Sequence, residues 1–116
     1  MITRKDEQII ETVEGAMGGQ GHAIFNRFIR EPAELYGKGR VFSIVTPEKD
    51  CEIGYHVHKG DGEFYCMLSG EVEYNDNGTV TTLRAGDTSF TADGEGHSAI
   101  NRKDEPASMI ALVIYN

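Results

Sequence analysis

The chain has 116 residues, of which 39% are hydrophobic, so it has room for one domain with a single core and not for two. Acidic residues outnumber basic residues by 19 to 11, and the formal net charge is −8. Because a chain of this charge is repelled by a phosphate backbone, nucleic acid is excluded as the expected partner.

The first residues lack the apolar run and small-residue cleavage site of a secretory signal, and no apolar stretch is long enough to cross a membrane. We therefore expect a cytoplasmic protein with no membrane partner. Cys51 and Cys66 both fall in apolar, strand-like segments. A free buried thiol is the commoner state there, so no disulfide is expected.

Fourteen glycines divide the chain into short apolar runs, a pattern typical of strands separated by turns. The first expected strand covers residues 23–30 (AIFNRFIR). Residues 31–35 predict one helical turn, because proline is tolerated at the start of a helix. Residues 40–46 (RVFSIVT) are rich in β-branched and aromatic side chains and predict a second strand.

The rest of the chain predicts a series of hairpins. A turn is expected at residues 59–62, and Asn77-Gly78 is a strong hairpin signal because both residues accept positive φ. About eight to ten strands in sequence-adjacent hairpins predict an all-β jelly roll or small antiparallel barrel with little helix. Further strands are expected at residues 52–58, 63–68, 71–74, 79–83 and 88–91, from 97 onward, and at 109–115.

Three of the four histidines, together with one glutamate, form a pattern that suits a metal ion. Side chains in a strand repeat with period two, so His56 and His58 point to the same face. Glu63 returns toward that face on the next strand, and His97 follows a second glycine-rich stretch. Three neutral imidazoles and one carboxylate leave one or two coordination positions for water or a ligand, which indicates a catalytic or binding site.

The spacing around the first three of these residues resembles the first motif of the cupin family. That motif is a glycine, five residues, His-x-His, three or four residues, a glutamate, six residues and a glycine. His56, His58, Glu63 and Gly70 match it, and Asp50 stands where the motif has its leading glycine.

The second cupin motif is a glycine, five residues, Pro-x-Gly, two residues, a histidine, three residues and an asparagine. Gly86, Gly94, His97 and Asn101 match it, and Ala92 replaces the proline. Both departures from the family pattern fall at turn positions, and neither falls at a metal ligand.

The resemblance implies a cupin-type jelly-roll barrel that occupies residues 1–116 as a single domain, with the metal-site core at residues 50–101. It also implies that the barrel holds one divalent transition metal, which is iron, manganese, zinc or nickel. Cupins include dioxygenases, decarboxylases, isomerases, sugar-binding modules and storage proteins, so the fold does not settle the reaction. The ligands that the resemblance implies are His56, His58, Glu63 and His97.

Three further residues are candidates for a catalytic role. Asp61, in the expected turn, and Glu95, two residues before His97, are carboxylates near the expected barrel mouth, although a carboxylate in a polar turn is more often only solvated. Arg40 would need a partner if it points inward, and it could bind a substrate carboxylate through two nitrogens. By alternation, the other side chains expected inside are Phe42, Tyr65 and Met67.

These features favour a metal-dependent enzyme that acts on a small, oxygen-rich molecule with adjacent carboxylate, carbonyl or hydroxyl oxygens. Dioxygenase chemistry would follow with Fe(II) and decarboxylation with Mn(II), and we prefer the oxidative reaction. One alternative is a non-catalytic barrel that binds or senses a small sugar or acid. Another is a structural barrel in which the metal only adds stability.

Two expectations concern the surface. The segment 63–68 (EFYCML) is apolar on both faces, so its outer face is expected to meet a second sheet or another subunit. We therefore expect a homodimer. His22 lies among glycines outside both motifs and is expected to be a solvated loop residue.

Overall fold

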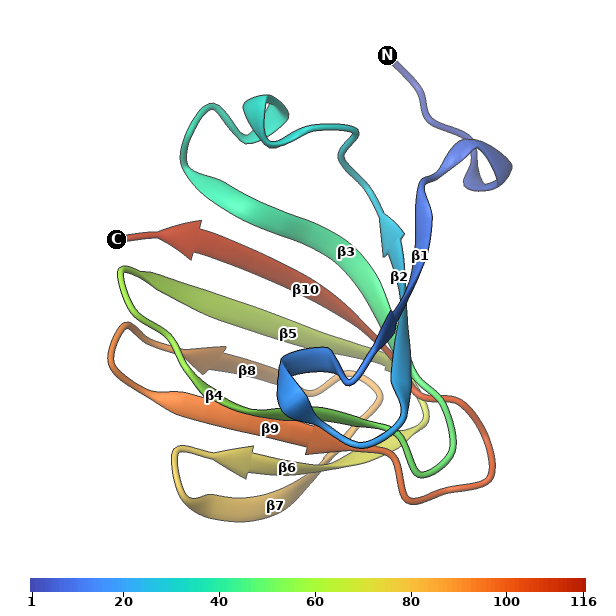
Figure 1. Cartoon of the computed structure of the whole chain (residues 1–116), viewed down its shortest axis with the longest axis vertical. Coiled ribbons are helices and arrows are strands. Elements are labelled where there is room, and N and C mark those ends of the chain that lie inside the picture. The colour runs from blue at the N-terminus through green and yellow to red at the C-terminus, as the bar shows by residue number, and fades with distance from the viewer.

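A computed structural model describes residues 1–116 as ten strands and three short 3-10 helices, which confirms the all-β prediction (Figure 1). The elements in chain order are η1 (Lys5–Glu7), β1 (Ile10–Glu14), η2 (Ala16–Gly18), β2 (His22–Arg27), η3 (Pro32–Leu35), β3 (Gly39–Pro47), β4 (Glu52–Val57), β5 (Asp61–Ser69), β6 (Glu71–Asp76), β7 (Thr79–Arg84), β8 (Thr88–Thr91), β9 (Gly96–Ile100) and β10 (Ser108–Tyr115).

The strands form two antiparallel sheets that face each other as a jelly-roll barrel (Figure 1). The larger sheet has the order β1-β2-β3-β10-β5-β8, and the smaller has the order β4-β9-β6-β7. Their inner faces share one hydrophobic core, to which Val45, Met67 and Met109 contribute from the larger sheet and Val72 and Tyr74 from the smaller. No helix in the structure has the length and apolar character needed to span a membrane.

Side chains along β5 point alternately into the barrel, toward the site, and outward to the surface. Glu63, Tyr65 and Met67 are buried, whereas Phe64 and Leu68 are exposed on the outer face. The prediction that Tyr65 and Met67 line the interior is therefore confirmed. Both cysteines carry free thiols, as expected; Cys51 is buried, whereas Cys66 is only partly buried.

The sequence missed the first strand. β1 forms an edge of the larger sheet and pairs with β2. Only Glu11 and Val13 of this strand are partly buried, so its inward face has a single apolar position and gives almost no periodic signal. The strand expected at residues 23–30 is β2, which ends earlier, at Arg27. The helical turn expected at 31–35 is η3.

The prediction that Phe42 lines the interior is wrong. Phe42 is in register with Leu112 on the outer face, and its ring packs edge-on against Phe28 with 4.8 Å between centroids. The pairing of β3 with β10 shifts its register between Val113 and Ile114, opposite Arg40. A bulge of this kind re-aims a side chain, so Arg40 reaches the site although Phe42 does not.

Candidate metal centre

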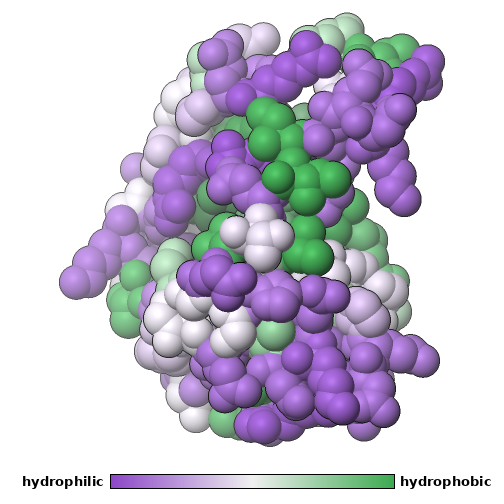
Figure 2. All heavy atoms as spheres, turned by 45° about the vertical axis from the view of Figure 1, so that its right-hand side comes forward, coloured by the Kyte–Doolittle hydropathy of each residue, from purple (hydrophilic) through white to green (hydrophobic).

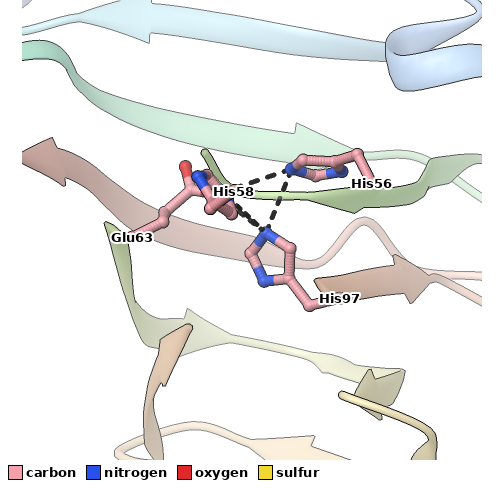
Figure 3. Close-up of side chains that lie close together, drawn as sticks. All are labelled: His56, His58, Glu63 and His97. Atoms are coloured by element: carbon pink, nitrogen blue, oxygen red, sulfur yellow. Dashed lines mark hydrogen bonds and ion pairs between the residues drawn. The ribbon is translucent and has the colours of Figure 1, made fainter. Parts of the chain in front are cut away.

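Three strands bring the predicted ligands together. His56 lies on β4 and His58 directly after it, Glu63 lies on β5, and His97 lies on β9 in register with His56. One donor atom from each of the four residues lies within 4.8 Å of the other three, and the side chains converge on one point (Figure 3). His58, Glu63 and His97 are buried. The prediction that these four residues share one place is confirmed.

The backbone around His58 is fixed from both sides. The His58 amide donates to the Glu95 carbonyl at 2.9 Å, and the Gly94 amide donates to the His58 carbonyl at 2.8 Å. The end of β4 is thereby tied to the loop that precedes His97. The two motifs of the sequence thus meet through backbone hydrogen bonds as well as through their side chains.

The distances between donor atoms suit a single small metal ion. The Glu63 Oε1 atom lies 3.3 Å from His58 Nε2 and 3.0 Å from His97 Nε2. The Nε2 atom of His97 lies 3.1 Å from the Nε2 atoms of both His58 and His56. Neighbouring donors that bind one ion at about 2.1 Å are themselves about 3 Å apart. The cluster could therefore hold one divalent ion.

The other ring nitrogens fix the tautomers that metal binding requires. His56 Nδ1 donates to the Gly54 carbonyl at 2.8 Å, and His58 Nδ1 donates to the Asp61 carboxylate at 2.7 Å. With the proton on Nδ1, the Nε2 lone pair of each ring points to the centre of the cluster. The donor set thus matches a borderline metal such as iron, manganese, zinc or nickel.

Hydroxyl groups hold His97 from the opposite side. The Tyr74 hydroxyl lies 2.7 Å and the Thr91 Oγ1 atom 2.9 Å from His97 Nδ1, and all three residues are buried. The ring of Tyr65 stacks on His97 with 5.0 Å between centroids. Sequence reasoning placed these residues in strands but missed their contact with His97, because the packing of one sheet on the other decides it.

Burial and hydrogen bonds with the histidine ring nitrogens shift the pKa values of the groups in the cluster. Burial alone would raise the pKa of Glu63, but hydrogen bonds that the Nε2 atoms of His58 and His97 donate when they carry a proton in place of a metal outweigh it and lower that pKa to about 2. Burial lowers the pKa of His56. The hydrogen bond to Glu63 raises the pKa of His58 despite burial. At neutral pH the site thus holds an ionised carboxylate, and protons compete with a metal for His58.

The expectation that Asp61 lies in a solvated turn is wrong. Asp61 is the first residue of β5 and is buried. Its carboxylate accepts hydrogen bonds from His58 Nδ1 and from Arg40 Nε, the second at 3.0 Å, and these bonds compensate for the loss of water. Burial opposes ionisation, but these two bonds prevail and lower the pKa of Asp61. Arg40, Asp61 and His58 therefore form a continuous polar chain that leads to the metal cluster.

The remaining candidate, Glu95, lies in a turn beside the site and not on the wall of the hollow around the cluster. Its carboxylate accepts from the Ala92 amide at 2.9 Å. Proline, which the second cupin motif has at the position of Ala92, has no amide hydrogen and could not donate that bond, so the Ala92–Glu95 contact compensates for the departure from the motif.

Asp50, at the glycine position of the first motif, adopts a φ of 60°, which aspartate tolerates better than most residues.

The cluster opens into a hollow of about 140 Å³ lined mainly by apolar side chains, among them Phe25, Val41 and Tyr65. A second hollow of about 320 Å³ shares Phe25, Arg40 and Val41 with the first and lies nearer β1 and β2. Figure 2 brings the β1–β2 side forward and shows apolar atoms between hydrophilic surfaces. Arg40 stands where the two hollows meet.

Known proteins resemble this chain over nearly its full length. Residues 43–115 match the family model of the cupin domain. The oxalate-binding protein of Thermotoga maritima is 31% identical over 114 residues, which cover 98% of this chain and 93% of that protein. The crystal structure of a predicted oxalate decarboxylase from the same organism has a TM-score of 0.94 at 29% identity and covers 100% of both chains.

A second solved structure agrees in fold. An uncharacterised Klebsiella pneumoniae protein with a double-stranded β-helix domain has a TM-score of 0.70 at 28% identity, over 98% of this chain and 89% of that one. The family match, the relative of similar length and the barrel with its buried histidine and glutamate cluster agree. The chain belongs to the cupin family.

Proposed function

We propose that this chain binds a small dicarboxylate of the oxalate type at a divalent metal held by the four residues of the cluster. The observation that supports this most directly is the pairing of a three-histidine, one-carboxylate donor set with an arginine at the edge of the same small hollow. The relative in Thermotoga maritima named as an oxalate-binding protein supports the same ligand class.

Arg40 is the residue that would recognise the free end of the ligand. Its Nε atom is held by Asp61, whereas its two terminal nitrogens have no hydrogen-bond partner in the structure. A guanidinium fixed at one nitrogen keeps its plane oriented and can present its remaining donors to a carboxylate. Asp61 thus positions both Arg40 and His58.

The walls of the hollow limit what can enter. Its volume of about 140 Å³ lies well below that of a pocket for a drug-sized molecule, which is about 300–1,000 Å³. Apolar side chains such as Val45, Ile53 and Val113 line the hollow beside the Glu63 carboxylate, which is 9% exposed. A bound divalent ion would act as a Lewis acid and offer open positions to ligand oxygens. A compact chelating acid fits this arrangement.

Calorimetric titration of oxalate into metal-loaded and metal-free protein tests the proposal. We expect binding only with metal, and Arg40→Gln should weaken it by about tenfold or more, because a charge-assisted contact is lost. Arg84→Gln is the matched control, since Arg84 is an exposed arginine on β7 of the other sheet. Equal binding to metal-free protein, or to Arg40→Gln, would contradict the proposal.

A second candidate function is decarboxylation of the same ligand, which is supported by the likeness to a predicted oxalate decarboxylase. Hydrogen oxalate would lose CO₂ by cleavage of its C–C bond, and the remaining carbon would keep the electron pair, take up the proton and become formate. Carbon NMR of labelled oxalate incubated with metal-loaded protein separates the two functions. Formate indicates an enzyme, and oxalate recovered unchanged indicates a binding protein. Oxygen uptake in the same mixture tests the dioxygenase reaction.

A further inference from the structure

The ligand hollow, which contains the metal cluster, adjoins a larger space. It has a volume of about 140 Å³, whereas the second hollow beside it has about 320 Å³. Phe25, Arg40 and Val41 line both hollows and so form the neck between them. The ligand hollow has room for the chelating head of a ligand, and the neck gives the rest of a longer ligand a place to go.

The second hollow is apolar on the side of the barrel core. Val13, Phe25 and Val41 line it and pack against the hydrophobic core cluster. Val13 is in register with the fully buried Ala23, so β1 and β2 turn these side chains to the same inner face. Apolar atoms reach the surface between hydrophilic side chains on this side of the molecule (Figure 2). A ligand that passes the neck therefore meets an apolar surface.

The charged residues around the second hollow compensate one another. Arg27 forms an ion pair with Glu11, and both line the hollow. Arg30 and Glu31 are neighbours in the chain and line it as well. A second carboxylate in this space would meet two acidic side chains beside the two arginines, so the wall gives it no net attraction. An uncharged apolar tail gains instead from burial against Val13.

We propose that the same site binds α-keto acids with an apolar tail, with the head at the metal cluster and the tail in the second hollow. The head binds as proposed for oxalate, so this proposal rests on the proposed function. An α-keto acid has a carbonyl beside its carboxylate and offers the same two chelating oxygens as oxalate.

The position of the neck fits the shape of such an acid. Oxalate chelated by two oxygens directs its other two oxygens away from the metal. In an α-keto acid one of those positions is a carboxylate oxygen and the other is the first carbon of the tail. The oxygen would meet Arg40, which stands at the neck, and the carbon would lead past Phe25 and Val41 into the second hollow.

Calorimetric titration of metal-loaded protein with pyruvate and with α-ketoisocaproate measures what the tail contributes. The two acids have the same head, but α-ketoisocaproate has an isobutyl group where pyruvate has a methyl group. We expect α-ketoisocaproate to bind about tenfold or more tightly, because its additional carbon atoms are buried in the second hollow. α-Ketoglutarate, whose tail carries a charge, should bind less tightly than α-ketoisocaproate.

Val13→Trp tests the second hollow separately, since Val13 lines this hollow and not the ligand hollow. The indole should fill the space of the tail and weaken binding of α-ketoisocaproate by about tenfold, whereas oxalate should keep its wild-type affinity. Ile10→Trp is the matched control, since Ile10 is 59% exposed on the other face of the same strand. It should leave both affinities unchanged.

Two further observations guard against a misplaced indole or a misfolded variant. The chain contains no tryptophan, so the fluorescence of each variant reports its single indole, and Val13→Trp should emit at a shorter wavelength than Ile10→Trp. Ile29→Asp places a charge in the same hollow from the loop after β2. It should also weaken binding of α-ketoisocaproate and not of oxalate.

The proposal is overturned if α-ketoisocaproate binds the wild type no more tightly than pyruvate or α-ketoglutarate does. It is equally overturned if Val13→Trp and Ile29→Asp, both folded by circular dichroism, bind α-ketoisocaproate as the wild type does. Oxalate in the same titrations separates this proposal from the proposed function. Metal-dependent oxalate binding without any gain from the tail overturns the second hollow alone, and absence of binding by all of these acids overturns both.

Discussion

Asp61 and Glu63 are two residues apart and both buried, yet they contact different atoms of the same imidazole. Glu63 faces the Nε2 atom of His58, and Asp61 accepts from its Nδ1 atom. A carboxylate that accepts a hydrogen bond from Nδ1 orients the ring and makes the Nε2 atom a better donor to a metal. Asp61 is therefore a positioning residue in this account, and whether it also acts in catalysis stays a prediction.

Asp61→Asn keeps the shape of the side chain and removes its charge. We expect it to weaken metal binding by about 10–100-fold, because the ring of His58 loses its charged partner. Competition with a metal-binding dye measures the affinity. Asp93→Asn is the control, since Asp93 bonds only to Gly60 and Asn116 on the surface. Unchanged metal affinity in Asp61→Asn would contradict the positioning role.

His22 is not simply solvated, because its Nε2 atom donates to Glu48 at 2.6 Å on the surface. That hydrogen bond raises the pKa of His22. A raised pKa means that the pair stabilises the fold when the ring is protonated. The stabilisation is complete below the ordinary histidine pKa of about 6.5 and is lost as the pH rises through the raised value.

His22→Gln should therefore lower the melting temperature more at about pH 6 than at about pH 9. Thermal unfolding of wild type and variant in the presence of a chelator measures the difference without interference from metal. An equal decrease at both pH values would show that His22 contributes by packing and not by charge.

Among the elements, η2 is held against β4 by two glycines with no room for side chains. A Cβ atom on Gly54 would overlap the Met17 carbonyl oxygen and lie 2.7 Å from the Gly19 amide nitrogen. Ala16 and Met17 of η2 line the ligand hollow. Close contact between these backbones thus builds one wall of the site, although the glycine-rich segment gave no predicted element.

Gly54→Ala should lower the free energy of unfolding by about 1–3 kcal/mol, since the added methyl group overpacks this contact. It should also weaken oxalate binding, because η2 must move away from the hollow. Urea unfolding and calorimetry measure the two effects. Thr81→Ala on the exposed hairpin is the control. Wild-type stability in Gly54→Ala would show that the chain accommodates the methyl group elsewhere.

The sequence predicted elements well where local chemistry decides them. Asn77 and Gly78 both adopt positive φ, 49° and 103°, in the turn between β6 and β7. The apolar run at residues 63–68 predicted β5, which begins earlier, at Asp61, and the period of two along a strand predicted its inward residues Tyr65 and Met67. The sequence failed for β1, which has only one apolar side chain on its partly buried face, and for Phe42, because a bulge in the pairing with β10 turns Arg40 to the site and leaves Phe42 on the outer face.

At the scale of the molecule, the four proposed ligands come from segments up to 41 residues apart, and the antiparallel pairing of His56 with His97 closes that distance. The cupin motifs made this convergence predictable. The contacts of Tyr74 and Thr91 with His97, and that of Asp61 with Arg40, depend on how the strands pack around the barrel. No local pattern in the sequence encodes them.

The most direct test is the metal content of tag-free protein after reconstitution, measured by elemental analysis beside that of His58→Ala and His22→Ala. We predict about one divalent transition-metal ion per chain in the wild type and in His22→Ala, whose histidine lies outside the cluster. His58→Ala, with its fold checked by circular dichroism, should retain almost none. Wild-type metal well below one ion per chain, or equal content in His58→Ala, would contradict the account of this barrel as a metal-dependent dicarboxylate site.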